Sequence, residues 1–582
     1  MRAPRLRLIG RYLRPHRRQV ALGAAALLVV NLLGVAIPLQ VRNVVNDLHQ
    51  GFSLQVVLRQ ALLIVVMATV MGLVRLWSRM LVFGVGRQVE ADLKQRIFDQ
   101  VLLQEPGWVQ SAGSGEVISR ATSDVENVRR LLGFAVLSLT NTVMAYALTL
   151  PAMLAIDPWL SVAALALYPL MLMVVRLFGG RMMLQQRRQQ ESLAQLSDLI
   201  QEDLSGIGAI KIYGQEKTEQ EAFARLNRDY RDAALALGRT RATLFPMLEG
   251  IASVSLLLLL AFGSGQIENG RLTIGGLVAL ILYVERLVFP TALLGFTLNT
   301  FQTGQVSLDR VEDLLARRPL IVSPSHPEPR ALTPLGALEA RALEVRYPGV
   351  ARPVLRDLSF RIEPGELVAV VGPVGCGKTT LARALGRMVE VPAGQLFIDG
   401  VDVTALALPE LRSQVALVPQ EGFLFTATLA DNLRYGDPFA GPDRIEEAAR
   451  QARLEGDIRG FPDGYETLVG ERGITLNGGQ RQRTALGRAL LMEAPLLVLD
   501  DALASVDNTT AAAILAEVRR QRHRTVLMIS HQLSAAAACD RILVLEEGQL
   551  VQQGHHSELV SRSGTYRRLW EREQASERLQ TA

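Results

Sequence analysis

The sequence contains only two cysteines, Cys376 and Cys539, in 582 residues. Two thiols exclude a disulfide framework and a cysteine-based metal cluster, and they agree with a reducing compartment. Neither sign of charge is in large excess, because the formal net charge is only +5. This near balance gives little support for nucleic-acid binding, and we expect no nucleic-acid partner. The basic residues agree better with loops that face anionic lipid headgroups.

Charged residues are absent from the segment Val20–Val41, and hydrophobic residues make up 49% of the chain. The segment meets the requirement of about 20 apolar residues for a membrane-spanning helix. Seven arginines precede it within the first 18 residues, so the positive-inside rule places the N-terminus in the cytoplasm. A signal peptide is the alternative interpretation, but the apolar run is long for a signal core and no small-residue cleavage site follows it.

Five more apolar runs follow in the first half of the chain. We therefore expect a multi-pass protein of the inner (plasma) membrane with six spans. The polar stretches Arg87–Arg130 and Arg176–Arg241 are too long for simple connections, and we expect their helices to continue beyond the bilayer into the cytoplasm. The predicted spans are Val20–Val41, Leu54–Gly86, Leu131–Ile156, Pro158–Val175, Leu244–Ile267 and Thr273–Phe301.

Proline crowds the segment "RRPLIVSPSHPEPRALTPLG", and hydrophobic periodicity is lost there, which indicates a linker. Beyond it, short β-branched runs alternate with helical stretches, a pattern typical of a parallel sheet covered by helices. The predicted organisation is an α-helical transmembrane domain over residues 1–316, a linker over 317–336, and an α/β P-loop nucleotide-binding domain with a C-terminal helix over 337–582.

The segment "GPVGCGKTT" follows a predicted strand and opens a predicted helix, which is the context that a phosphate-binding loop needs. Gly372, Gly375 and Gly377 let the backbone curl so that its N–H groups face phosphate oxygens. Lys378 is expected to reach the β- and γ-phosphates, and the Thr379 hydroxyl is expected to bind Mg²⁺. A nucleotide is therefore the predicted ligand.

Four further residues could complete such a site. Asp500 ends an apolar strand, where a buried carboxylate needs a partner such as Mg²⁺. Gln420 lies in a loop from which it could contact the metal and the γ-phosphate, and His531 lies just past another strand, where it could contact the γ-phosphate or orient water. Tyr347 could stack on an adenine ring. Taken singly, Gln420 and His531 would more often be structural residues, and Tyr347 is evenly balanced between adenine stacking and a surface position.

A second glycine-rich helix start lies in the segment "LNGGQRQRTALGRALL". Asn477, Gly478, Gly479 and Gln480 precede or open this helix, which gives the domain a second anion-binding helix start. One nucleotide does not need two such sites from one chain. Two chains arranged head to tail do, because each can present this helix start to the other chain's phosphates.

Together these motifs resemble the ABC transporter superfamily over essentially the whole chain, and the six spans resemble a half-transporter of the type IV exporter fold. The resemblance implies a dimer that encloses two ATP molecules with Mg²⁺, an intracellular loop around Tyr213 that reaches the partner, and a "GERG" segment, residues 470–473, that contacts intracellular loops. It assigns Gly372–Thr380, including Thr380, to the Walker A motif, Gln420 to the Q-loop, Leu476–Gln480 to the signature motif, Leu496–Asp500 to the Walker B motif, Asp507 to the D-loop and His531 to the switch histidine.

Two residues depart from the family pattern. Asn477 replaces the usual signature serine but can still donate a hydrogen bond to a phosphate. Asp501 replaces the catalytic glutamate and lacks one methylene, which withdraws the carboxylate by about 1.5 Å. Because displacements of about 1 Å can cost on the order of 10²-fold in rate, we predict slow hydrolysis at this chain's own site. The alternative is that a small backbone shift lets Asp501 reach the water.

Two slow sites would make a poor exporter, so we expect a heterodimer with a homologous half-transporter that carries the catalytic glutamate. Two other hypotheses are a homodimeric lipid flippase and an ATP-gated membrane subunit that does not hydrolyse ATP. Charges inside spans usually face a cavity, although they can also pair with neighbouring helices. A mixed-charge cavity would suit amphipathic drugs, peptides or lipids. The candidate substrate contacts are Glu249, Glu285 and Arg286, and Arg75 and Arg79 also lie within predicted spans.

Overall fold

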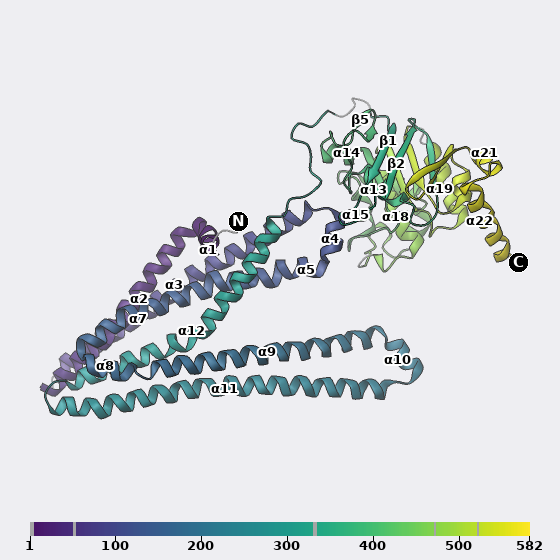
Figure 1. The fold of residues 1–582 in the computed structure, drawn as a ribbon. Coiled ribbons are helices and arrows are strands. Elements are labelled where there is room, and N and C mark those ends of the chain that lie inside the picture. Colours follow the sequence, from purple (N-terminus) through teal and green to yellow (C-terminus); the bar gives the residue numbers. More distant parts are fainter. Residues whose placement is uncertain (1–4, 51–53, 330–333, 471–472, 521–522, 582) are drawn as a thin grey trace. The chain divides into compact units, whose positions relative to one another are not determined.

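The computed structural model describes residues 5–50, 54–329, 334–470, 473–520 and 523–581 (Figure 1). The chain forms two compact units. The first, here the transmembrane unit, comprises residues 1–102 and 113–317, and the second, here the nucleotide unit, comprises residues 103–112 and 318–582. The short helix α4 (Pro106–Ala112) therefore belongs with the second unit although it lies early in the sequence.

The transmembrane unit is entirely helical where it is described, and six of its helical segments are long and apolar enough to cross a membrane. The prediction of six apolar spans is confirmed. These segments are Arg7–Leu48, Leu54–Leu102, Ser114–Ile156, Pro158–Ser205, Glu216–Glu268 and Ile274–Leu315. The helices are α1 (Arg5–Leu13), η1 (Arg14–His16), α2 (Arg17–Gln50), α3 (Leu54–Leu102), α5 (Ser114–Ser119), η2 (Arg120–Asp124), α6 (Val125–Arg130), η3 (Leu131–Ala135), α7 (Val136–Ile156), α8 (Pro158–Leu165), α9 (Tyr168–Ser205), α10 (Ile207–Tyr213), α11 (Glu216–Glu268) and α12 (Ile274–Leu315).

Most of these helices run well beyond the predicted apolar spans, because hydropathy marks only the part of a helix that suits lipid. Helices α9 and α11 contain 38 and 53 residues and lie side by side along their length (Figure 1). The short helix α10 joins their polar ends, and the left-handed Gly214 (φ 64°) closes it. The polar stretch Arg176–Arg241 is thus a helical hairpin that continues the fourth and fifth spans.

Two of the spans are interrupted. The third contains π-helical turns at η2 and η3, where backbone hydrogen bonds are rearranged. The fourth breaks between α8 and α9, and Pro169 stands in the first turn of α9, where its missing N–H leaves no hydrogen bond unmade. The sequence analysis gave only the bounds of the spans and did not locate these breaks, because they carry little hydropathy signal.

A buried carboxylate ties the third span to the sixth. Asp124 is almost fully buried, and its Oδ1 accepts hydrogen bonds from Ser307 Oγ at 2.7 Å and Arg310 Nη2 at 2.5 Å. Asn127 Nδ2 also donates to Ser307 Oγ, at 3.1 Å. Because a buried carboxylate needs such partners, the cluster fixes the π-helical turn against α12.

The nucleotide unit contains two sheets. One is six-stranded in the order β10-β9-β3-β8-β7-β6, with parallel pairs from β9 to β6 and an antiparallel pair of β10 with β9. The other is antiparallel in the order β2-β1-β4-β5. The strands are β1 (Leu338–Val345), β2 (Leu355–Ile362), β3 (Leu367–Val371), β4 (Leu396–Ile398), β5 (Val401–Asp402), β6 (Val415–Val418), β7 (Leu496–Asp500), β8 (Thr525–Ile529), β9 (Arg541–Glu546) and β10 (Gln549–Gly554).

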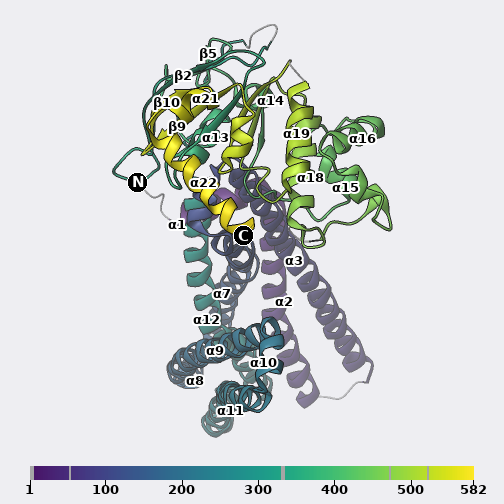
Figure 2. The ribbon, with the colours of Figure 1, turned by 90° about the vertical axis from the view of Figure 1, so that its right-hand side faces the viewer.

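Helices cover this sheet core, as the predicted α/β class requires, and that prediction is confirmed. Figure 2 shows α18 beside α15 and α16, against which it packs. The helices are α13 (Lys378–Leu385), α14 (Leu408–Gln414), α15 (Leu429–Arg434), α16 (Pro442–Gln451), α17 (Glu455–Ile458), η4 (Gly464–Glu466), α18 (Gly478–Leu491), α19 (Asn508–Arg520), α20 (Leu533–Ala537), α21 (His556–Ser561) and α22 (Thr565–Thr581).

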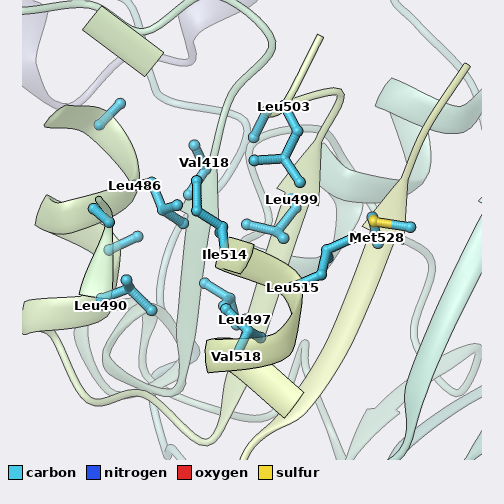
Figure 3. Close-up of a cluster of buried hydrophobic side chains, with 14 of the residues drawn as sticks. Val418, Leu486, Leu490, Leu497, Leu499, Leu503, Ile514, Leu515, Val518 and Met528 are labelled. Atoms are coloured by element: carbon cyan, nitrogen blue, oxygen red, sulfur yellow. The ribbon is translucent and has the colours of Figure 1, made fainter. Parts of the chain in front are cut away.

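Strand β7 is buried on both faces, which explains its unbroken apolar sequence. Leu497 and Leu499 point into the cluster shown in Figure 3, together with Ile514 of α19 and Leu486 of α18. The alternate residues, among them Val498, face a second cluster on the other side of the sheet. Each fully buried leucine stabilises the fold by about 1.5–3 kcal/mol, so the strand end that carries Asp500 is firmly held.

Candidate nucleotide site

The phosphate-binding loop connects β3 to α13, as the sequence predicts for this motif. Gly372, Gly375 and Gly377 have φ values of 154°, 81° and 102°, a region that side-chain-bearing residues rarely adopt. At Gly372 the approach is also close, because a Cβ there would lie 2.1 Å from the carbonyl oxygen of Leu545. All three positions therefore favour glycine for conformation, and Gly372 and Gly377 also for space.

Lys378 is buried in the centre of this loop. Its ammonium donates hydrogen bonds to the carbonyl oxygens of Gly372 at 2.8 Å and Pro373 at 3.0 Å. The thiol sulfur of the buried Cys376 lies 3.7 Å from the same nitrogen. The loop thus fixes one positive charge beside the backbone N–H groups at the start of α13, a suitable arrangement for a phosphate.

Thr379 and Asp500 meet at the adjoining strand end. Thr379 Oγ1 donates to Asp500 Oδ1 at 3.2 Å, and Asp500 is only 4% exposed. Burial raises the pKa of Asp500, while the Thr379 hydrogen bond opposes the rise and the neighbouring Asp501 adds to it. Two hard oxygen donors fit Mg²⁺, which commonly takes one or two protein ligands and completes its shell with phosphate and water. Within the described residues, no cluster of three metal-binding side chains competes with this pair.

Tyr347 lies next to Thr380 at the phosphate-binding loop. The Tyr347 hydroxyl lies 3.4 Å from Thr380 Oγ1, and its ring packs on the second core cluster. The predicted adenine-stacking tyrosine therefore lies beside the phosphate loop rather than elsewhere on the domain.

Asp501 follows the strand in a left-handed conformation with φ 51° and is 8% exposed. Aspartate is among the few residue types that enter this region readily. Its Oδ1 accepts a hydrogen bond from the backbone N–H of His531 at 3.3 Å, and its own N–H donates to Ile529 O at 2.9 Å. The short side chain is thus directed to the His531 backbone, and the ends of β7 and β8 are joined by it.

The signature segment forms a complete N-terminal cap on α18. Asn477 Oδ1 accepts from Gln480 N at 2.8 Å, while Gln480 Oε1 accepts from Asn477 N at 3.0 Å. Because the Asn477 oxygen is used in this cap, its amide nitrogen is the group left to donate outward. At Gly479 a Cβ would lie 2.9 Å from Ser505 O, so the helix start is packed tightly against the D-loop. The "GERG" segment includes Glu471 and Arg472, which lie outside the described residues.

Gln482 is a functional candidate that the sequence did not reveal. It is 6% exposed, its Nε2 donates to Gln420 O at 3.2 Å, and its Oε1 accepts from Ser505 N at 2.9 Å. One buried amide therefore joins the signature helix, the Q-loop and the D-loop. Gln482 lies two residues past Gln480 in "GGQRQR". The only signal in the sequence is a polar residue at a position where α18 faces the interior of the domain.

Two loop residues complete the description. The side chain of Gln420 is exposed and forms no hydrogen bond with the described residues, whereas its carbonyl oxygen accepts a hydrogen bond from Gln482. Asp507 caps α19 by accepting hydrogen bonds from Thr509 Oγ1 and from Thr510 N, and these bonds lower the pKa of its carboxyl. The D-loop is thus fixed at both ends.

The candidate substrate contacts lie in the transmembrane unit, and only some of them line the same cavity. Glu285 and Arg286 of α12 line a cavity of about 930 Å³ among α2, α3, α7 and α12, and Arg75 and Arg79 of α3 line it as well. Glu249 of α11 is exposed and is not part of that lining. The sequence placed these charges within spans but could not tell which of them share a cavity.

Known proteins resemble this chain along nearly its whole length. Residues 20–291 match the family model described as the ABC transporter transmembrane region, and residues 355–504 match the model described as ABC transporter. Over 565 residues the chain is 32% identical to the multidrug resistance-like ATP-binding protein MdlA of Escherichia coli (strain K12), covering 96% of this chain and 95% of that protein.

Two further similarities agree with these. The ATP-dependent lipid A-core flippase of Syntrophus aciditrophicus (strain SB) is 31% identical over 558 residues, which cover 96% of this chain and 92% of the flippase. The solved structure of a bacterial Atm1-family ABC exporter with ATP bound superimposes with a TM-score of 0.78 at 27% sequence identity, and the match covers 96% of this chain and 98% of that one.

Proposed function

The chain belongs to the ABC transporter family, and we propose that it is one subunit of a heterodimeric ATP-driven exporter of amphipathic compounds. Its six apolar spans and its nucleotide unit form the fold of an ABC exporter, and relatives that span its length are named for multidrug resistance and lipid A-core flipping. In this proposal the compounds are drugs, peptides or lipids that leave the cytoplasm or the inner leaflet.

One observation carries the proposal of two unequal partners, the aspartate at position 501. A glutamate there would reach one methylene further toward a water beside the γ-phosphate. The Asp501 carboxylate instead accepts a hydrogen bond from the backbone N–H of His531. General-base assistance is typically worth 10²- to 10⁴-fold in rate, so this chain's own site is expected to bind ATP and hydrolyse it slowly.

The other half of the proposal concerns the partner's site. The signature helix keeps Gly478, Gly479 and Gln480, and its cap leaves the amide nitrogen of Asn477 available to donate to a phosphate. This helix start would therefore complete the ATP site of a homologous half-transporter that carries a catalytic glutamate. Hydrolysis in the pair would take place mainly at that second site.

The dimer would be joined partly through the α9–α10–α11 hairpin. Ile212 and Tyr213 are adjacent at its tip and are 80% and 75% exposed, so they offer an apolar and an aromatic side chain to a partner. We place this tip, the N-terminus and the nucleotide unit in the cytoplasm, with Ile212 and Tyr213 against the partner's nucleotide unit. The basic N-terminal segment supports that orientation.

We assign residues 1–316 to the transmembrane domain, 317–336 to the linker and 337–582 to the nucleotide-binding domain. ATP would be held by the phosphate loop, Tyr347 and the partner's signature helix, and Mg²⁺ by Thr379, Asp500 and Gln420. The Thr379–Asp500 contact supports the metal position. His531 would contact the γ-phosphate from the end of β8.

A homodimeric lipid flippase is the second candidate, favoured by the 31% identity to a lipid A-core flippase. It requires that Asp501 support hydrolysis in both sites of the dimer. Activity of this chain without a partner therefore separates the two functions.

The test is the steady-state ATPase activity of this chain purified alone in lipid, compared with Asp501→Glu. We expect the wild type to be nearly inactive and the glutamate variant to gain on the order of 10²-fold, because the carboxylate then reaches the water. Asp501→Asn is the matched control and should stay at the wild-type level. Full wild-type activity that glutamate does not raise would overturn the heterodimer in favour of the homodimer.

A further inference from the structure

The cavity of the transmembrane unit carries an excess of positive charge. Arg75, Arg79 and Arg286 line its volume of about 930 Å³, and Glu285 is the single acidic residue among its lining residues. Arginine remains charged in any protein environment, so the lining contributes a formal charge of two positive units. We call the region around these four residues the cationic cavity.

The three arginines form no ion pair with a carboxylate in the part of the chain that the structure describes, and Glu285 forms none there either. Arg75 instead lies close enough to Arg79 and Arg286 to repel both. Charges inside a membrane domain are costly when they are unpaired, so like charges brought together there indicate an anionic ligand.

Arg286 is held in place by the neighbouring helix. Its Nη2 donates to Asn31 Oδ1 at 3.0 Å and to Asn31 O at 3.3 Å, both on α2. The guanidinium lies directly over Gly34, where a Cβ would fall 1.2 Å from Nη1. Among the described residues, the buried Nε has no hydrogen-bond partner. Gly34 and Asn31 thus position the guanidinium at the cavity wall.

Much of the remaining wall is apolar, although Asn31, Ser78, Ser138, Asn141 and Thr142 also line it. Phe83, Phe134, Phe289 and Phe296 line the same cavity, and the rings of Phe134 and Phe296 meet edge to face at 5.5 Å. Such a wall suits a hydrocarbon tail, whereas the arginine side suits a group that accepts several hydrogen bonds.

We propose that the cationic cavity selects amphipathic compounds with an anionic headgroup, a phosphate or a carboxylate, over cationic ones. Guanidinium groups bind both headgroups through paired charge-assisted hydrogen bonds, which a quaternary ammonium cannot accept. This inference rests on the proposed export function, because it names the class of compound that the exporter carries. The headgroup lies between Arg75, Arg79 and Arg286, and the tail lies against the phenylalanines.

The test uses three photoreactive probes with the same diazirine-bearing dodecyl tail. Their headgroups are phosphate, carboxylate and trimethylammonium. The full-length chain is reconstituted in phosphatidylcholine nanodiscs without ATP, and cross-linked peptides are quantified by mass spectrometry. Labelling of the cavity peptides is divided by labelling around Leu257, an exposed residue of α11 outside the cavity, which corrects for partition into lipid.

Both anionic probes should label the cavity about tenfold more than the cationic probe, the ratio expected for one charge-assisted hydrogen bond. Arg75→Gln, Arg79→Gln and Arg286→Gln should each reduce that ratio several-fold. Arg59→Gln removes the same charge from α3 outside the cavity and should leave it unchanged. Gly34→Ala should reduce it too, because the added methyl displaces Arg286 without changing charge.

The outcomes are distinct. Labelling by phosphate alone or by carboxylate alone supports the proposal and identifies the headgroup. Equal labelling by all three probes, stronger labelling by the cation, or no response to the arginine variants overturns it. The experiment needs no ATP hydrolysis, so it tests the headgroup preference separately from export. Selective labelling without any probe-stimulated ATPase activity of the complex would overturn the export function and keep the headgroup preference. ATPase activity of the complex that only the cationic probe stimulates would overturn the headgroup preference and keep the export function.

Discussion

The phosphate loop and the cationic cavity both present positive charge to an anion, but they hold that charge differently. In the loop, Lys378 is buried and donates to two backbone carbonyl oxygens, so its position follows from the backbone. In the cavity, Arg286 is the only one of the three arginines that hydrogen-bonds to a neighbouring helix among the described residues, while Arg75 has one weak contact with Met71 of its own helix. The first arrangement fits one ligand geometry, and the second fits a class of ligands defined by charge.

The largest expected effect is at the phosphate loop, the region that fits one ligand geometry. Lys378→Arg keeps the charge, but a planar guanidinium cannot replace a compact ammonium between Gly372 O and Pro373 O. We expect the Kd for ATP of this chain purified alone to rise on the order of 10²-fold, because a charge-assisted hydrogen bond to phosphate, worth about 1.5–3 kcal/mol, is lost.

Arg75→Lys is the matched exchange in the cavity. It should retain part of the labelling by the anionic probes, since the positive charge remains although an ammonium cannot form the paired hydrogen bonds of a guanidinium. Equal losses at both positions would show that the two regions are built alike.

A smaller effect is expected at Gln482, which has no counterpart in the cavity. Gln482→Glu preserves size and the acceptor for Ser505 N but places a carboxylate oxygen against Gln420 O, so one hydrogen bond becomes a repulsion. We expect turnover of the assembled complex to fall about tenfold while the Kd for ATP changes little. A purely structural role predicts a lower melting temperature and weaker ATP binding together. Gln549→Glu, at an exposed position of β10, is the control.

The smallest effect concerns stability and Asp500. Burial raises the pKa of Asp500 above its ordinary value of 3.8, so the folded state favours the protonated carboxyl. The unfolded state ionises from about pH 3.8 while the folded state still binds the proton, so the free energy of unfolding falls as pH rises from 3.8 to the raised pKa. Without nucleotide, Asp500→Asn should melt a few degrees higher than the wild type at neutral pH.

Two further measurements sharpen that result. The difference in melting temperature should shrink as pH falls toward 3.8 and disappear below it, where both states bind the proton. Stabilisation by Mg²⁺ and ATP should be weaker in the variant, because a metal ligand is lost. A variant that is less stable than the wild type at neutral pH would show that the carboxylate is a net structural asset.

The sequence was sufficient for the family, for six apolar spans and for an α/β nucleotide domain, and these predictions are confirmed. Each depends on a local pattern: an uncharged run such as Val20–Val41, or a glycine-rich turn between strand and helix. Helix ends were less accessible, since α9 and α11 continue for many polar residues beyond the lipid-compatible part. The π-helical turn at Leu131–Ala135 left no trace in the composition.

The candidate site shows the same difference between residues in local sequence motifs and residues that are brought together only by folding. Residues in contiguous motifs, such as Lys378 and Thr379, could be nominated from spacing, and their assigned roles stay predictions. Gln482 could not, because its role depends on residues 420 and 505, which are brought to it only by folding. The association of Arg286 with Gly34 likewise joins positions about 250 residues apart. Neither pairing leaves a periodicity that a single sequence reveals.

The paired helices α9 and α11 also have a mechanical consequence. At about 1.5 Å per residue, the 38 residues of α9 make a rod about 57 Å long. A tilt of only about 5° at one end then carries the other end through about one helical turn of 5.4 Å. Pairing with α11 stiffens the rod against bending. A small rotation at the α10 tip would thus be amplified into an ångström-scale displacement at the far end, and a kink introduced midway would absorb it.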